Sequence, residues 1–265
     1  MQADLAAAEI EHRRAGRHLL LLLDFDGTLA AFSNDPTTVH LDSDTSALLE
    51  RLAANAAITL GIISGRRLPD LQKRVTFSGD MYLAGFHGLE IHAPGEVFIH
   101  PGAASATTLM QSIADAIQPH VAPLPGVFIE DKVFSIALHY REAAPAARVV
   151  ATSHFMNAAR VDIDAGRLRL LPGAGVIELL PDAAWHKGSA LEWIRERVER
   201  IHGPTFTVYV GDDVTDQDAF RAIGLHGLAI SASERATGSE FSVDGPDGVM
   251  RLLNCLDGPK DNRRA

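Results

Sequence analysis

The stretch "LLLLLDFDGTLAAF" (19–32) decides how this sequence folds. Its five consecutive leucines predict a strand that is buried on both faces, as in a parallel sheet covered by helices. Asp24 and Asp26 follow immediately, and residues two apart share one face if the strand continues. Two like charges at the end of an apolar strand raise the question of what makes their proximity tolerable.

Helix and strand patterns alternate on both sides of the middle of the chain. The segment 43–56 has leucines at helical spacing behind a Ser/Asp/Thr start, and the apolar runs 57–64 and 81–88 predict strands. The alternation returns near the C-terminus, where we predict helices at 188–201, 216–223 and 247–256 and strands at 205–213 and 227–231. A parallel sheet with helices on its faces accounts for this pattern.

The middle of the chain follows another pattern, helix, hairpin, helix, hairpin, which is typical of an antiparallel sheet. We predict helices at 107–121 and 145–160, a hairpin over 126–141 that turns at Asp131-Lys132, and strands at 167–173 and 175–181. The predicted fold class is therefore α/β. A Rossmann-like parallel-sheet core is expected at 1–103 and 176–265, with an α+β cap domain inserted at 104–175.

The composition limits the partners and the location. The chain has 265 residues, a net charge of −10 and a single cysteine. The acidic balance argues against a nucleic-acid partner, and no apolar run approaches the roughly 18 residues that a membrane span needs. Cys255 has no partner for an internal disulfide, and we expect it to be buried beside Leu252 and Leu253. The N-terminus does not resemble a signal peptide, so we predict a cytoplasmic protein.

Polar residues end the predicted core strands. Asp24 and Asp26 end the first, Ser64 ends the second, and Asp212 ends the last long one. Open parallel sheets place their sites beyond the carboxyl ends of the strands, so these groups can converge there with Lys187. Clustered carboxylates repel one another unless a cation is present, and oxygen ligands favour Mg²⁺. The set predicts a phosphoryl site in which a carboxylate attacks phosphorus.

Each of these residues also has a simpler explanation when it is taken alone. Asp-Gly-Thr is good turn chemistry, and Ser64-Gly65 could form an ordinary turn. Lys187 could be a solvated lysine at a helix start, and Asp213 and Asp216 could cap the next helix. Only their joint occurrence at the ends of strands favours a site.

Four segments resemble the motifs of the haloacid dehalogenase superfamily in its phosphatase branch: "DFDGTL" (24–29), "SGR" (64–66), Lys187 and "GDDVTD" (211–216). The resemblance implies that Asp24 is the nucleophile, which forms an aspartyl-phosphate, and that Asp26 is the general acid and base. It further implies phosphoryl binding by Ser64, charge stabilisation by Lys187, and Mg²⁺ ligation by Asp24, Asp212 and the main-chain carbonyl of Asp26, with Asp213 and Asp216 nearby.

The segment "IEDKVFSIALHYR" (129–141), together with "GFHGLEI" (85–91), resembles trehalose-6-phosphate phosphatases, and this resemblance covers nearly the whole chain. Carboxylates and cations at strand ends suit a polyhydroxyl ligand. The resemblance implies a small sugar phosphate as substrate, with its hydroxyls bound by Glu130, Lys132, Arg141 and Glu178, and with Gly65, Arg66, His87 and Gly88 completing the substrate site. Two positions depart from the family pattern, Gln217 where Glu is common and His186 where an amide or acid is expected.

The predicted function is Mg²⁺-dependent hydrolysis of trehalose 6-phosphate to trehalose and phosphate. Other functions stay open: a sucrose-phosphate or mannosylglycerate-phosphate type of phosphatase, a mutase on the same core, or a non-catalytic sugar-phosphate sensor. The resemblance also allows association with a trehalose-phosphate synthase. Glu130 and Lys132 alone also fit a solvated hairpin turn, whereas the intact core motifs argue against an inactive protein.

Overall fold

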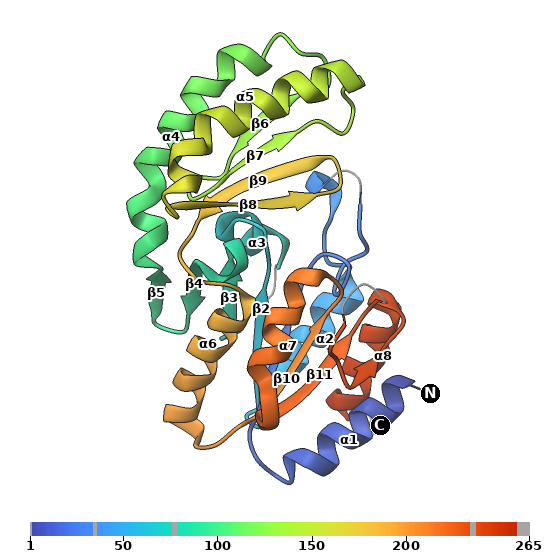
Figure 1. Cartoon of the computed structure of the whole chain (residues 1–265). Coiled ribbons are helices and arrows are strands. Elements are labelled where there is room, and N and C mark those ends of the chain that lie inside the picture. Colours follow the sequence, from blue (N-terminus) through green and yellow to red (C-terminus); the bar gives the residue numbers. More distant parts are fainter. Residues whose placement is uncertain (1, 34–35, 76–78, 234–236, 259–265) are drawn as a thin grey trace. The chain divides into compact units, whose positions relative to one another are not determined.

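The computed structural model describes residues 2–33, 36–75, 79–233 and 237–258. The chain divides into two compact units (Figure 1). The first unit comprises Met1–Phe98 and Trp185–Ala265, and the second comprises Ile99–Ala184. The second unit is therefore an insertion into the first.

The first unit is built on an eight-stranded sheet of order β12-β11-β10-β1-β2-β3-β4-β5. The central strand β1 (Leu19–Leu23) lies parallel to both of its neighbours, β10 (Phe206–Gly211) and β2 (Ile58–Ile63). Parallel pairing continues outward to β3 (Tyr82–Gly85), β11 (Gly227–Ser231) and β12 (Phe241–Ser242), whereas β4 (Glu90–Ala93) is antiparallel to β3 and β5 (Glu96–Ile99) forms the other edge.

The five leucines of β1 divide between the two faces of this sheet, because side chains alternate along a strand. Leu19, Leu21 and Leu23 belong to the core that also includes residues of α1 (Gln2–Arg14), α2 (Ser43–Ala53), α3 (Leu68–Arg74) and α8 (Gly245–Asp257). Leu20 and Leu22 belong to the core shared with α6 (Lys187–His202) and α7 (Gln217–Ile223). All five leucines are fully buried, which confirms the strand predicted from their sequence.

The second unit is a four-stranded antiparallel sheet with two helices packed on one side (Figure 1). The helices are α4 (Pro101–Val121) and α5 (Pro145–Asp164), and the sheet has the order β6-β7-β9-β8. The strands are β6 (Phe128–Asp131), β7 (Ile136–His139), β8 (Leu168–Gly173) and β9 (Val176–Pro181). Ile136, Leu138 and Leu179 join the helices in its core.

The insertion is longer than the predicted segment 104–175. The structure places its end after Ala184, because β9 pairs with both β7 and β8 and so belongs to the antiparallel sheet. The N-terminal helix α1 and strands β4 and β5 were not predicted. The prediction that Cys255 is buried is wrong: the residue is exposed, and its Sγ lies 3.5 Å from Asp4 Oδ1. Among the described residues, no helix combines the length and apolarity needed to cross a membrane.

Candidate active site

A buried lysine joins two strand ends of the first unit. Lys187 is the first residue of α6, and its Nζ donates to Asp24 Oδ1 at 2.8 Å and to Asp216 Oδ1 at 2.6 Å. Asp24 follows β1, and Asp216 lies in the short turn after β10. The three residues are 3%, 5% and 0% exposed, respectively, so these are ion pairs largely removed from water. Such pairs are favourable only when geometry and further hydrogen bonds satisfy the charges.

Asp216 has those further bonds. Its Oδ1 also accepts from the Tyr209 hydroxyl at 2.7 Å, and its Oδ2 accepts the main-chain N–H groups of Asp212 and Asp213 at 3.0 and 2.9 Å. Asp213 completes a capping box with Asp216 at this turn. Asp213 is thus a helix cap, whereas Asp216 does more than cap, because it fixes the ammonium group of Lys187.

The network has more negative than positive charge. Carboxylate oxygens of Asp24, Asp212 and Asp216 lie within 4.8 Å of one another, and all three residues are buried. Burial raises the pKa of Asp24 well above its usual range, even though Lys187 opposes this shift. Burial also disfavours the charged form of Lys187, but Asp216 and Asp24 outweigh it and raise the pKa of the ammonium group. Lys187 is therefore a fixed cation at the site.

This carboxylate cluster fits a divalent cation. With all three carboxylates ionised, their charge exceeds that of the one ammonium by two, and oxygen-liganded Mg²⁺ would offset this excess and favour the ionised form of Asp24. Both oxygens of Asp216 already accept hydrogen bonds, so Asp24 and Asp212 are the better ligands. Gly27 keeps room for Asp212, since a Cβ at Gly27 would come within 2.4 Å of its carboxylate.

Ser64 directly follows β2, at the carboxyl end of the parallel strands where Asp24 also lies, and it is buried. Its main-chain N–H donates to the Ala84 carbonyl at 2.9 Å, and its Oγ accepts from the Arg66 N–H at 3.2 Å. The hydroxyl therefore keeps its own proton for donation to an acceptor. Gly65 follows it, directly beneath the ring of His87.

Arg66 forms a bidentate ion pair with Asp26. Its Nε and Nη2 donate to the two Asp26 carboxylate oxygens at 2.7 and 2.5 Å, and its Nη1 donates to Asp70 at 3.0 Å. Arg74 holds Asp70 from the other side with two bonds of 2.8 Å. Substrate binding by Arg66 stays a prediction; in the structure Arg66 orients the Asp26 carboxylate, which is expected to transfer protons.

The predicted sugar-binding residues lie in the second unit. Glu130 and Glu178 both flank Ala137 in the sheet register and therefore share one face. Lys132 Nζ donates to Glu178 Oε2 at 3.1 Å, and Ser135 Oγ donates to Glu178 Oε1 at 2.6 Å. Glu130 lies 2.9 Å from His139 Nε2, and Arg141 donates to the Ala174 carbonyl at 3.1 and 2.8 Å. The face thus presents charged groups with defined partners.

Several residues of these networks were not predicted from the sequence. Tyr209, Asp70 and Ser135 have no motif of their own and become visible only through the groups that they touch. His186, one of the departures from the family pattern, caps α6 by accepting the Ser189 N–H at its Nδ1. A cap of this kind explains how His is accommodated immediately before Lys187.

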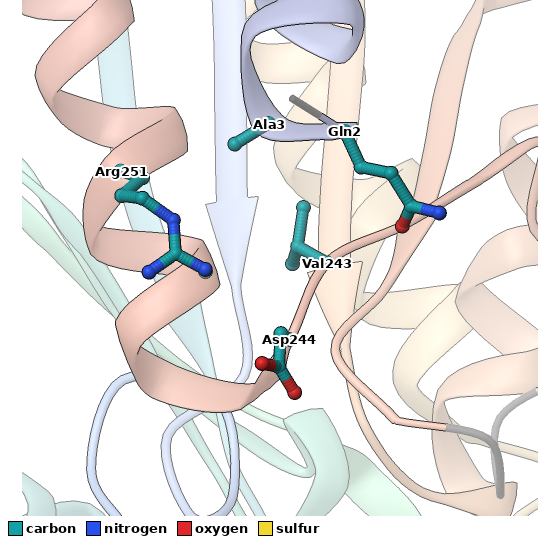
Figure 2. Close-up of a pocket in the computed structure, with 6 residues that line it drawn as sticks. Gln2, Ala3, Val243, Asp244 and Arg251 are labelled. Carbon is teal, nitrogen blue, oxygen red and sulfur yellow. The ribbon is translucent and has the colours of Figure 1, made fainter.

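A pocket of the first unit lies at the start of α1 beside α8 (Figure 2). Its lining includes Gln2, Val243, Asp244 and Arg251, and it contains none of the predicted site residues. We therefore assign it no part in the site.

The fold is that of haloacid dehalogenase-like proteins. A crystal structure of a haloacid dehalogenase-like hydrolase from Bacteroides thetaiotaomicron matches 91% of this chain and 100% of its own, with a TM-score of 0.61 at 14% identity. The C-terminal domain of C. albicans trehalose-6-phosphate phosphatase matches 97% of both chains, with a TM-score of 0.78 at 21% identity.

Sequence comparison identifies the family. The sequence model of the family described as trehalose-phosphatase matches residues 22–244. The trehalose-phosphate phosphatase of Mycobacterium avium (strain 104) is 38% identical over 252 residues, which cover 91% of this chain. The match spans 63% of the length of that relative. The chain belongs to the trehalose-phosphatase family.

The role of Asp216 can be tested through stability. Asp216→Asn removes the negative charge that pairs with Lys187 and places an amide NH₂ against groups that all donate to Asp216. We expect the free energy of unfolding to fall by about 3 kcal/mol, as for a broken buried ion pair. Urea denaturation measures this change, and Asp218→Asn, at an exposed i,i+3 pair with Arg221, is the matched control. A loss below about 1 kcal/mol for Asp216→Asn would contradict the anchoring role.

Proposed function

We propose that this chain hydrolyses trehalose 6-phosphate to trehalose and phosphate through an aspartyl-phosphate on Asp24. The observation that carries the proposal is the buried contact of Asp24 with Lys187, which fixes a carboxylate beside a permanent cation at the carboxyl end of the central strand β1. Family membership supports the choice of substrate.

The reaction has two displacements at phosphorus. In the first, an Asp24 carboxylate oxygen forms a bond to phosphorus, and the bond from phosphorus to the sugar oxygen breaks. The departing oxygen takes a proton from Asp26. In the second, Asp26 takes a proton from water, whose oxygen attacks phosphorus and releases phosphate and free Asp24. The bidentate contact with Arg66 orients the ionised Asp26 carboxylate, the form that follows the first transfer and takes the proton from water in the second.

Other residues of the first unit bind the phosphoryl group. The Ser64 hydroxyl and the Gly65 N–H donate to its oxygens, and Lys187 offsets the charge that develops on them. Mg²⁺, held by Asp24, Asp212 and the main-chain carbonyl of Asp26, would supply further neutralisation of the phosphoryl oxygens. His87 and Gly88 are proposed to lie near this group rather than near the sugar.

The sugar is bound by the second unit. Glu130, Lys132, Arg141 and Glu178 offer charged donors and acceptors, which suit hydroxyl groups. The pairs between Lys132 and Glu178 and between His139 and Glu130 hold these side chains in place before substrate binds. The cytoplasmic location and an association with a trehalose-phosphate synthase stay predictions.

The substrate and the cation can be tested together. Phosphate release should be fastest from trehalose 6-phosphate and much slower from sucrose 6-phosphate, mannosylglycerate phosphate and glucose 6-phosphate. It should stop with EDTA and return with Mg²⁺, because the carboxylate cluster repels a phosphate dianion. Full activity in chelator contradicts the metal, and preference for another ester reassigns the substrate. Transfer of phosphate to a second sugar would indicate a mutase, and no turnover would favour a sensor.

Substitution of Asp24 and substitution of Asp26 should have different effects on turnover. Asp24→Asn should abolish turnover and leave no phosphate on the protein, because an amide is a poor nucleophile. Asp26→Asn should slow turnover by about 100- to 10,000-fold through loss of proton transfer. Rapid-quench trapping of labelled phosphate distinguishes them, with Asp44→Asn on α2 as a control. Labelled protein from Asp24→Asn would show that another residue is the nucleophile.

Substitution of the proposed sugar-binding residues should slow hydrolysis of the sugar phosphate but not of a phosphate ester without a sugar. Glu130→Ala or Arg141→Ala should lower kcat/KM for trehalose 6-phosphate by about 10- to 1,000-fold, as expected for one or two lost charge-assisted hydrogen bonds. Hydrolysis of p-nitrophenyl phosphate should change far less, because it lacks the hydroxyls. Glu142→Ala, at an exposed neighbouring position, is the matched control. Equal losses on both substrates would assign these residues to folding or general catalysis instead.

A further inference from the structure

The turn that follows β3 has a backbone conformation that L-residues rarely adopt. Phe86, His87 and Gly88 have φ angles of 51°, 57° and 97° in succession. Glycine reaches this left-handed region freely, but Phe and His do so at a cost in free energy. Such a conformation persists only where surrounding contacts impose it, and it occurs preferentially at functional sites.

One set of those contacts joins the turn to the Ser64 loop. The His87 N–H donates to the Ser64 carbonyl at 2.9 Å, and the Phe86 N–H donates to the Arg66 carbonyl at 2.8 Å. The His87 ring covers Gly65, where a Cβ would come within 2.9 Å of the ring Cε1. Phe86 is 2% exposed, so its side chain anchors the turn in the interior.

A second set of contacts joins the same turn to the start of α6. The Trp185 indole N–H donates to the Gly88 carbonyl at 2.8 Å. A Cβ at Gly88 would lie 2.2 Å from the Cβ of Ala190, in the first turn of α6. Only glycine allows this close approach, and Lys187 lies between Trp185 and Ala190 in the chain.

We propose that the left-handed turn Phe86–Gly88 is a positioning element for the phosphoryl group, setting the Ser64–Gly65 loop and the Lys187 ammonium at a fixed separation. His87 acts on the loop through its ring and N–H, and Trp185 acts on Lys187 through its bond to Gly88. Neither side chain needs to touch the substrate. This inference rests on the proposed function only in taking Ser64, Gly65 and Lys187 as the phosphate-binding groups.

Two variants test separately the contacts of the turn with the Ser64–Gly65 loop and its contacts with the start of α6. His87→Asn keeps a residue that tolerates the left-handed conformation but removes the ring from Gly65. Trp185→Phe keeps an aromatic ring near Phe98, 5.5 Å away in the native protein, but removes the donor to Gly88. His92→Asn on β4 and Trp193→Phe, whose ring also lies near Phe98, are the matched controls.

Inorganic phosphate in the presence of Mg²⁺ is the probe, and its affinity is measured by isothermal titration calorimetry. Both variants should weaken phosphate binding by about 3- to 10-fold, the effect of one displaced hydrogen bond. They should lower kcat for p-nitrophenyl phosphate by about 10- to 100-fold, because small displacements of catalytic groups are costly. The controls should leave both values unchanged.

The outcomes separate this inference from the proposed function. If the turn has only a structural role, the two variants will have a lower melting temperature but an unchanged phosphate affinity per folded molecule. That result overturns the inference. Equal effects of the controls, or no phosphate binding by the unaltered chain, overturn it as well. Failure to hydrolyse trehalose 6-phosphate, with weakened phosphate binding in the two variants, overturns the substrate assignment and leaves the positioning role supported.

Discussion

The first unit depends on one buried ammonium group shared by two carboxylates. Lys187 is separated from Asp24 by 163 positions in the chain and from Asp216 by 29, yet its Nζ lies within 2.8 Å of both. Burying these charges is favourable only if every partner is held in place. Tyr209 and two main-chain N–H groups hold Asp216, and the β1 strand between two parallel neighbours holds Asp24.

In the proposed function, the same network allows an acidic chain to bind an anionic substrate. The chain carries a net charge of −10, but the local field in a site matters more than the total charge. Lys187, the Ser64 hydroxyl and the Gly65 N–H face the phosphoryl group in the proposed mechanism, and the excess negative charge of the carboxylates provides a place for Mg²⁺. In that proposal, repulsion among the carboxylates is the reason why the reaction requires a cation.

Polar groups in both units are held before substrate binds. Asp26 is clamped by Arg66, which Asp70 holds in turn, and Glu178 is held by Lys132 and Ser135. Preorganised groups lose less conformational freedom on binding than free ones do. The left-handed turn at Phe86–Gly88 is preorganised in the same way. The free-energy cost of its backbone conformation is offset by contacts that form when the chain folds.

The sequence by itself determined the elements whose patterns are local. Five leucines followed by turn residues sufficed for the buried strand, since so short an apolar run suits a strand of a covered sheet better than a helix, and the residues after the strands indicated the site. Tertiary structure alone decided that Asp216 fixes Lys187, that Arg66 holds Asp26, and that β9 belongs to the insertion, because each depends on a partner distant in the chain. The left-handed turn belongs to this second group as well. Phe and His do not favour that conformation, and contacts with residues distant in the chain, among them Ser64, Arg66 and Trp185, impose it.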